Sequence, residues 1–203
     1  MKIDPSTLDF SKSHELLLGA TVPRPIAFVS TVGTDGVFNV APFSLFTVLS
    51  AKPPMVCLGI GRKRDGQKKD TLKNIEFSRD FVVNIVNEAL AEAMNQSSAE
   101  YPSDVDEFKE VGLTPVKSDI VKAPMVGESP ISMECRVVQI IEFGDAPRYT
   151  SIVIGEIIQI HVNDAILIDG KIQASKLRAV GRLGGELFCR TTDIFEMKRA
   201  YIP

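Results

Sequence analysis

Short apolar runs bounded by glycine, proline and charged residues dominate the hydrophobic pattern of this chain. Residues 24–32 form a β-branched and aromatic run that ends at the glycine- and aspartate-rich turn 33–36, and residues 37–44 return as its partner. Residues 55–60 and 81–86 are apolar throughout, which is typical of strands covered on both faces. The pattern therefore predicts a series of short, mostly antiparallel strands.

Two longer segments, 130–142 and 150–162, have the alternation expected of a long hairpin. In the first, apolar residues point one way and polar residues the other, which predicts a half-exposed strand: Ile131, Met133, Cys135 and Val137 against Ser132, Glu134 and Arg136. In the second, one face is predicted to hold Ile152, Ile154, Ile158, Ile160 and Val162, with Glu156 as its lone charge, and the opposite face Ser151, Gly155, Gln159 and His161.

Helical signals are few and short. One helix is predicted at Leu16 to Leu18, ending at Gly19, and a second at 71–78 with Asp70 as its N-cap. Further helical turns are expected at 87–95 and 104–111. Because strands dominate and no βαβ repeat appears, the fold class expected is mainly β with short helices, an antiparallel barrel with a proline- and glycine-punctuated loop over residues 112–130.

Composition narrows the functional classes. With 203 residues, 44% hydrophobic and 24% charged, residues 1–203 are predicted to form a single globular domain. A net charge of −3 and a pI near 5.5 argue against nucleic acid or anionic membranes as general partners. The three cysteines form no C-x-x-C pair, and no signal peptide or membrane-spanning apolar run is present, so we expect a cytoplasmic protein.

The strongest candidate site is the segment 59–71, which leaves a predicted buried strand and enters a predicted helix. Free N–H groups and the positive dipole end at a helix start favour a phosphate. Five lysines and arginines crowd this approach, and Thr71 offers a hydroxyl. A solvated basic loop is the alternative interpretation, and the spacing alone leaves both open.

Two common phosphate motifs are excluded in this segment. Gly59 and Gly61 begin a dinucleotide fingerprint, but Arg64 stands where its third glycine is needed. Gly61 and Gly66 have the spacing of a P-loop, but Gln67 stands where that motif requires lysine. The segment therefore predicts an anion site of some other kind.

Two further segments are candidates for contact with a flat ligand. Pro42 must interrupt strand pairing, which leaves Asn39 and Ser44 as hydrogen-bonding groups beside the small Ala41, or a plain strand end. Near the C-terminus, the glycine pair 184–185 precedes Phe188, which can cover a ligand or pack in a core. The only histidines, His14 and His161, lack metal-ligand spacing, and no hydrolase or zinc-protease motif occurs.

Taken in order, these motifs resemble the flavin-reductase-like, or flavoredoxin-like, FMN-binding split-barrel family. The resemblance covers about residues 20 to 190 and lies in R-P-I-A at 24–27, N-V-A-P-F-S at 39–44, G-I-G-R at 59–62, K-D-T at 69–71, E-S-P at 128–130, G-E at 155–156 and G-R-L-G-G at 181–185. Each motif is weak alone, whereas the ordered set is fairly specific.

The resemblance implies a homodimer with FMN in a groove near the subunit interface. The residues expected to border the isoalloxazine ring are Ser30, Thr31, Asn39, Ala41, Pro42, Phe43 and Ser44. Those expected to hold the phosphate are Gly61, Arg62, Lys69, Asp70 and Thr71, with Phe188 as a further cofactor contact. This agrees with the anion site inferred from charge and helix position.

The chemistry would then belong largely to the flavin, with NAD(P)H as co-substrate passing hydride to it and no catalytic protein group required. One departure matters: many short members of the family have a Gly-Asp-His triplet, whereas here Gly144-Asp145 leads into Ala146 without a histidine. Three functions therefore stay open: an NAD(P)H-dependent reductase of flavin or another acceptor, an FMN electron-transfer protein serving a monooxygenase or redox partner, and a binding module without turnover.

Overall fold

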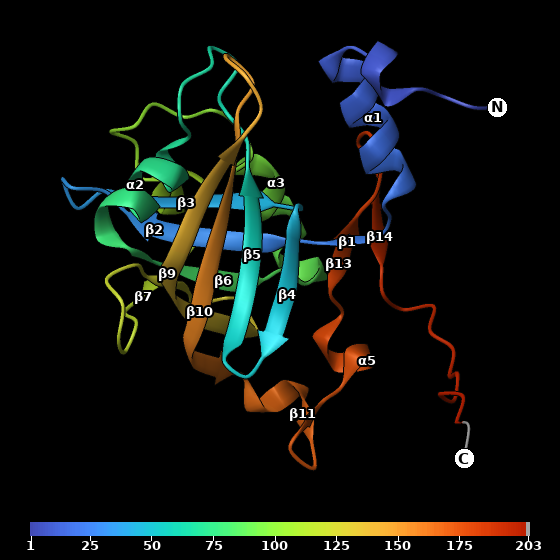
Figure 1. Cartoon of the computed structure of the whole chain (residues 1–203). Coiled ribbons are helices and arrows are strands. Elements are labelled where there is room, and N and C mark those ends of the chain that lie inside the picture. Colours follow the sequence, from blue (N-terminus) through green and yellow to red (C-terminus); the bar gives the residue numbers. More distant parts are fainter. Residues whose placement is uncertain (202–203) are drawn as a thin grey trace.

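A seven-stranded antiparallel sheet forms the body of the protein, whose computed structural model describes residues 1–201 (Figure 1). The strand order is β3-β2-β6-β9-β10-β5-β4. Their bounds are β2 Ala27–Val32, β3 Phe38–Phe43, β4 Phe46–Ala51, β5 Pro54–Ile60, β6 Asp80–Ile85, β9 Ile131–Phe143 and β10 Thr150–Val162. The predicted pairing of 24–32 with 37–44 and the predicted long hairpin are both confirmed.

Three small sheets and short helices complete the chain. The sheets are β1 (Arg24–Pro25), β13 (Val180–Arg182) and β14 (Phe188–Arg190); β7 (Pro115–Val116) and β8 (Met125–Val126); and β11 (Leu167–Ile168) and β12 (Lys171–Ile172). The helices are α1 (Phe10–Ala20), α2 (Asp70–Ser78), α3 (Ala91–Gln96), α4 (Glu107–Glu110) and α5 (Ala174–Leu177), with 3-10 turns at Pro5–Thr7, Glu88–Leu90 and Asp164–Ile166. The expected fold class, mainly β with short helices, is confirmed.

The sheet curls so that its two ends meet around one core. Phe43 from β3 is buried in the same cluster as Val56, Leu58 and Ile60 from β5, near the opposite end of the strand order. In β10, a Cβ added to Gly155 would lie 2.6 Å from the ring of Phe81. The glycine is therefore required for packing, which explains its place in the glycine–glutamate motif.

The helix expected at 71–78 is present, with a different start. Asp70 is its first helical residue, and the N-cap is Lys69, whose side chain makes no capping hydrogen bond. The helix ends at Arg79, which adopts the left-handed conformation with φ of 61°. The prediction of Asp70 as N-cap is wrong because its carboxylate is engaged by other side chains, as described below.

Other helix predictions differ at their ends. The first helix continues past Gly19 to Ala20, the expected turns at 104–111 shrink to α4, and the expected helix 87–95 is a 3-10 turn followed by α3. The expected loop 112–130 includes the short β7–β8 hairpin.

Covering segments of the same chain bury both faces of the central strands. β2 and β6 are buried along nearly their whole length. In β6, Val83 faces the main core, while Val82 packs against Val121 and Ala123 of the loop that precedes β8. β5 instead alternates between buried and half-buried residues, so the expectation that it is covered on both faces is wrong.

The two long strands depart from simple alternation. A register shift between Ile157 and Gln159 breaks the predicted common face of β10: Ile152, Ile154 and Ile158 lie on the side away from the main core, whereas Ile160 pairs with Met133, which packs against that core. In β9, Glu134 is fully buried and not half-exposed, because the loop before β8 covers it. Among residues 1–201 no helix is long and apolar enough to cross a membrane, and a cytoplasmic location stays a prediction.

Candidate functional site

An open groove of about 640 Å³ separates α1 from one end of the large sheet. Figure 1 shows α1 standing beside the sheet, above the small sheet formed by β1, β13 and β14. The groove is lined by three groups of residues: Phe10, His14, Glu15 and Leu18 of α1; Arg24, Pro42, Phe43, Ser44, Leu45, Gly59, Gly61, Arg62 and Lys69 around the sheet; and Arg148, Tyr149, Thr150, Arg182, Leu183 and Gly185 from two loops. Such a volume is typical of a cofactor site.

The buried guanidinium of Arg24 holds the groove together. It donates to the backbone oxygens of Leu18 and Thr21 at the end of α1 and of Leu183 in the opposite loop. Its Nε lies 3.3 Å from the hydroxyl of Ser44. The arginine of the R-P-I-A motif therefore joins both walls of the groove, which the sequence did not reveal.

A second, small cavity of about 70 Å³ lies at the start of α2. It is lined by residues from β3, the 62–71 segment, and the 97–107 segment: Asn39, Ala41, Pro42, Lys63, Lys69, Asp70, Thr71, Ser97, Ser98, Ala99, Glu100, Tyr101 and Glu107. Pro42 and Lys69 border both cavities. The two spaces are therefore adjacent, with Lys69 between them.

Lys69 differs from three of the other four cations of this segment, and the fourth, Arg64, lines neither cavity. Arg62 pairs with Glu142, Lys63 with Asp70 at 2.6 Å, and Lys68 with Glu76 at 2.6 Å. Within residues 1–201, Lys69 makes no ion pair, and its Nζ lies 5.8 Å above the ring of Phe43. A lysine free of carboxylates at an uncapped helix start is suited to an anion.

Asp70 is neutralised on both oxygens. Besides Lys63, it accepts hydrogen bonds from Lys73 at 3.0 Å and from the Ser103 hydroxyl at 2.8 Å. Burial raises the pKa of Asp70, but these three donors outweigh burial and leave the pKa below its ordinary value. Its role here is to bind neighbouring cations and not to hold an anion directly.

Asn39 is held by a buried hydrogen-bond network. Its Oδ1 accepts from the hydroxyls of Thr71 at 2.8 Å and Thr31 at 3.1 Å, and its Nδ2 donates to Oε2 of Glu107 at 2.6 Å. Asn74 donates to Thr31 at 3.0 Å. The network links β2, β3, α2 and α4, and Asn39 is therefore fixed by the protein, contrary to the expectation of a free group.

Glu107 was not anticipated from the sequence. It is 7% exposed and receives its hydrogen bonds from Asn39 and from the N–H of Val40, both on Oε2. Burial, assisted by the charge of Asp70, raises its pKa to about 7, against the lowering effects of the Val40 hydrogen bond and of Lys63 and Lys69. Nothing local in the sequence signals this role, because its partners lie 67 and 68 residues away.

Most predicted site residues converge on the two cavities. Asn39, Ala41, Pro42, Lys69, Asp70 and Thr71 line the small one, and Pro42, Phe43, Ser44, Gly61, Arg62 and Lys69 line the groove. Arg62 is committed elsewhere: its guanidinium also donates to Ser151 at 3.0 Å and stacks 5.6 Å from the centre of the Tyr149 ring. It therefore shapes the groove wall.

Three predicted residues lie outside both cavities. Ser30 is fully buried on the other side of β2, where its hydroxyl donates to the backbone oxygen of Pro124. Thr31 is fully buried and contributes through the Asn39 network. Phe188 lines a separate cavity of about 190 Å³ together with Pro42 and Ser44. The guanidinium carbon of Arg182 lies 4.3 Å from the centre of the Phe188 ring.

The groove's rim carries side chains that were not assigned from the sequence. Phe10 of α1 stacks on His14 with ring centres 5.7 Å apart, and Arg148 lies 4.9 Å from the centre of the Phe10 ring. Arg148 and Tyr149 belong to the loop that lacks the family's histidine. This loop therefore contributes a cationic and an aromatic side chain to the groove, whereas many short members of the family have a histidine in the corresponding triplet.

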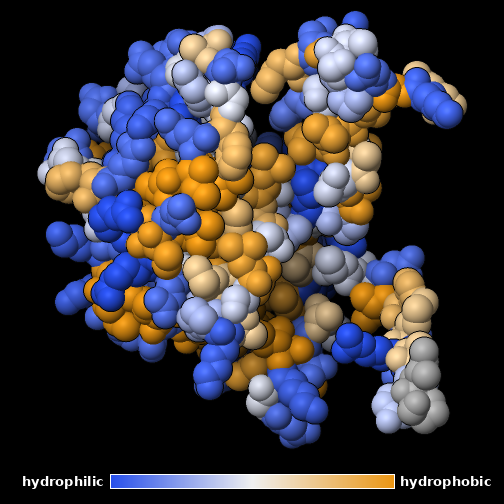
Figure 2. Space-filling model, viewed as in Figure 1, coloured by the Kyte–Doolittle hydropathy of each residue, from blue (hydrophilic) through white to orange (hydrophobic). Residues whose placement is uncertain are grey.

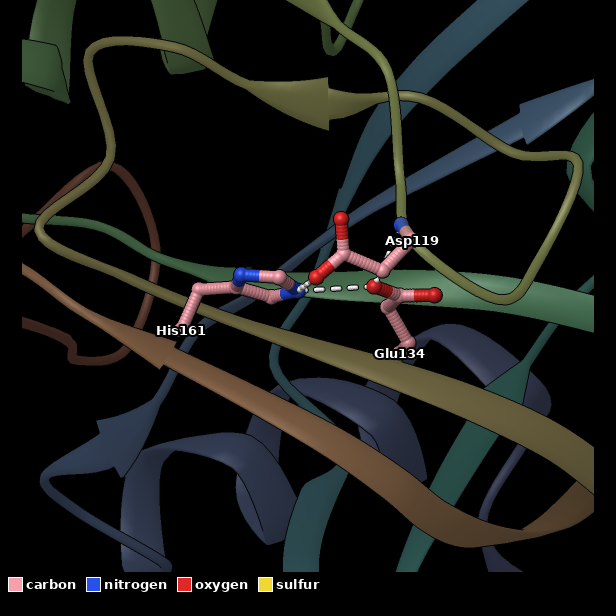
Figure 3. A group of neighbouring side chains, drawn as sticks. All are labelled: Asp119, Glu134 and His161. Atoms are coloured by element: carbon pink, nitrogen blue, oxygen red, sulfur yellow. Dashed lines mark hydrogen bonds and ion pairs between the residues drawn. The ribbon is translucent and has the colours of Figure 1, made fainter.

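Asp119, Glu134 and His161 form the one cluster of potential metal ligands among the described residues (Figure 3). Nε2 of His161 lies 2.7 Å from Glu134 and 4.0 Å from Asp119. The Glu134 carboxylate also accepts from the N–H groups of Asp119, Ile120 and Val121 at 2.7 to 2.9 Å. Since its lone pairs are already used, the cluster is explained as a clamp on this loop.

Comparisons with known proteins agree with this geometry. A family model described as a flavin reductase like domain matches residues 18–175. Nitrilotriacetate monooxygenase component B from Bacillus cereus superposes with a TM-score of 0.92 at 33% identity, over 97% of this chain and 98% of that one. The 2-nitrobenzoate 2-nitroreductase NbaA of Pseudomonas fluorescens gives 0.90 at 30%, over 100% and 98%.

A Shewanella frigidimarina protein with a split barrel domain gives a TM-score of 0.83 at 25% identity, over 98% of this chain and 100% of that one. The split-barrel architecture expected from the resemblance is therefore confirmed. The residues matched by the family model include β2 to β10 and the whole lining of the small cavity at the start of α2. On this evidence, the chain belongs to the family of flavin-reductase-like split-barrel proteins.

Proposed function

We propose that the protein is an FMN-dependent oxidoreductase that transfers electrons from NAD(P)H to flavin or another acceptor. The observation that carries this proposal is the position of Lys69, which makes no ion pair with any described residue and lies at the uncapped start of α2, between a small polar cavity and a large groove. A phosphate needs positive charge and N–H donors, and a tricyclic ring needs a wide, partly apolar groove.

The residues present fit FMN. Lys69 and the first N–H groups of α2, including that of Thr71, would hold the phosphate, with Lys63 and Asp70 setting the local charge. Pro42, Phe43, Ser44, Gly61 and Arg62 would border the ring, with Ala41 at the small cavity beside it, while Asn39 and Thr31 fix the wall behind it. One small anion cavity and the lack of an adenosine-binding fingerprint favour FMN over FAD.

When bound, the flavin supplies the hydride chemistry, and the protein supplies orientation and shelter from water. The wall formed by α1 and Arg24 limits solvent access to the groove. Phe10, Arg148 and Tyr149 form the rim that a nicotinamide or another acceptor must cross. No side chain is required to act as acid or base.

A second candidate function is electron transfer to a protein partner. The loop 144–150 lacks the histidine of many short reductases, which favours this alternative. The similarity to a monooxygenase component B supports a partner that consumes electrons or reduced flavin, and the similarity to a nitroreductase supports an acceptor other than flavin. The present geometry favours the first candidate, because the groove is open to a small co-substrate.

Anaerobic mixing of the FMN-loaded protein with NADH or NADPH tests the choice. Rapid loss of the flavin absorbance at about 450 nm is the result expected of the reductase. Bleaching only by a reduced protein donor would favour the electron-transfer alternative, and no bleaching by either would leave a binding module and contradict the proposal.

We also propose that the chain works as one domain within a homodimer. The large sheet has an outer face with half-buried or exposed apolar residues on three adjacent strands, namely Cys57, Val138, Ile141, Ile152 and Ile154. Figure 2 shows a broad hydrophobic area over the sheet, bordered by hydrophilic side chains. A contiguous apolar area of this kind is typical of a protein interface.

A further inference from the structure

The small cavity at the start of α2 contains a carboxyl group that the proposed chemistry does not use. Glu107 is more than nine-tenths buried and lines this cavity together with Lys69 and Thr71. Both of its hydrogen bonds end on Oε2. Within residues 1–201, Oε1 of Glu107 receives no hydrogen bond, and this oxygen keeps some accessible surface. Glu107 lines both this cavity and the neighbouring cavity beside α2, so its carboxyl group is within reach of a phosphate bound in the small cavity.

The charges around Glu107 disfavour the binding of a dianion next to its ionised carboxylate. Lys63 is already paired with Asp70, so among the described residues that line this cavity Lys69 is the cation without an ion pair. The other ionisable groups that face Glu107 or share its helix are Glu100 and Tyr101 across the small cavity, Asp35 and Lys73 across the neighbouring cavity, and Asp106, Lys109 and Glu110 on its own turn.

A phosphomonoester carries close to two negative charges above neutral pH, since its second pKa is about 6. Placing it beside an ionised, buried carboxylate would set like charges in a poorly solvated space, which is costly. The raised pKa of Glu107, about 7, indicates that protonation of this group is already easy in the unliganded protein.

We propose that Glu107 takes up one proton from solvent when the phosphate of FMN binds at the start of α2, and that the resulting carboxylic acid donates a hydrogen bond from Oε1 to a phosphate oxygen. A neutral donor replaces a charge repulsion, and an O–H donor to an anionic oxygen is among the stronger hydrogen bonds. This inference rests on the proposed function, because it requires the FMN phosphate in this cavity. Phosphate binding thereby becomes linked to pH.

Calorimetry of FMN binding at pH 8, in two buffers of different ionisation enthalpy, counts the protons taken up. The wild type is expected to take up between about half a proton and one proton per FMN, and none with riboflavin, which lacks the phosphate. Glu107→Gln, which keeps an oxygen for Asn39 and Val40, is expected to bind FMN without proton uptake.

Glu100→Gln is the matched control, because Glu100 is an exposed carboxylate on the same cavity and should leave the proton count unchanged. Retained riboflavin affinity shows that Glu107→Gln is folded. If that variant fails to fold, an infrared difference spectrum of the wild type decides: a new carboxylic-acid band with FMN, absent with riboflavin, is expected.

Equal proton counts for FMN and riboflavin would overturn the inference while leaving the proposed function intact. So would continued proton uptake by Glu107→Gln, since the proton would then belong to the phosphate or to another group. Failure of both flavins to bind would instead contradict the proposed function itself.

Discussion

Two buried glutamates show how the hydrogen-bond donors around a carboxyl group set its chemistry. Glu134 receives three backbone N–H groups besides its contact with His161, and these lower its pKa although burial alone would raise it. Glu107 receives two donors on a single oxygen, and burial dominates. The first is held as a structural anion, and the second can gain a proton.

The clamp formed by Glu134 predicts a loss of stability in acid. A carboxyl with a lowered folded-state pKa stabilises the fold above its unfolded pKa, about 4.5, and that contribution disappears as the pH falls through the lower folded value. Glu134→Gln should therefore lower the free energy of unfolding at pH 7 by about 3 kcal/mol and lose less on acidification than the wild type. Urea unfolding at pH 7 and in acid measures this, with exposed Glu186→Gln as the control. An unchanged stability at pH 7 would contradict the clamp.

Sequence alone could place some site residues and not others for a physical reason. Adjacent residues of a strand point to opposite faces, so Ser30 and Thr31 could not both face one ligand, and the structure turns Ser30 toward Pro124. Lys69 and Pro42 line both cavities, and they could be singled out because charge, proline and helix position are local signals. Glu107 depends on a contact between distant segments, which no local pattern indicates.

At the scale of elements, α1 depends on other parts of the chain for its position. None of its residues is buried, and the buried side chain of Arg24 binds the oxygens of Leu18 and Thr21 at its end. A helix with no buried face gains little from packing, so its position rests largely on these hydrogen bonds.

Arg24→Gln should therefore release α1 from the groove. We expect amide hydrogen exchange across α1 to rise at least about tenfold and FMN affinity to fall, because one wall of the groove loses its support. Lys12→Gln, a substitution at an exposed position of the same helix, should leave exchange unchanged apart from fraying. Unchanged protection of α1 in Arg24→Gln would show that other contacts hold it.

Strands and their partners could be predicted because each apolar run ends at a turn signal, as 24–32 does at the 33–36 turn. The register shift near Ile158 could not be predicted from the sequence. The extra residue leaves the apolar pattern of the strand unchanged, but the residues after it point to the opposite faces of the sheet. The burial of Glu134 could not be predicted either, because the loop that covers it, which includes Ile120, lies earlier in the chain and its contact with β9 has no local signal.

At the scale of the whole molecule, the apolar runs of β2 and β6 give no support for a dimer, because segments of the same chain cover both faces of these strands. The outer face that includes Ile152 and Ile154 provides that support instead.

Ile154→Lys should convert the dimer into a monomer, because a charge would be buried at the centre of the interface. Light scattering should give twice the chain mass of 22.2 kDa for the wild type and the single-chain mass for the variant. Phe77→Lys, at a 63% exposed position on α2, is the control. A wild-type monomer that still binds FMN tightly would contradict the proposed dimer.

The central claim, that the start of α2 binds the phosphate of FMN, is tested most directly by comparing FMN and riboflavin affinity in Lys69→Ala. Lys68→Ala, which removes the neighbouring lysine paired with Glu76, controls for general charge. We predict that Lys69→Ala weakens FMN binding at least tenfold, about 1.4 kcal/mol, while riboflavin affinity in both variants and FMN affinity in Lys68→Ala stay near the wild-type values. Equal losses for FMN and riboflavin, or an unchanged FMN affinity, would contradict this assignment.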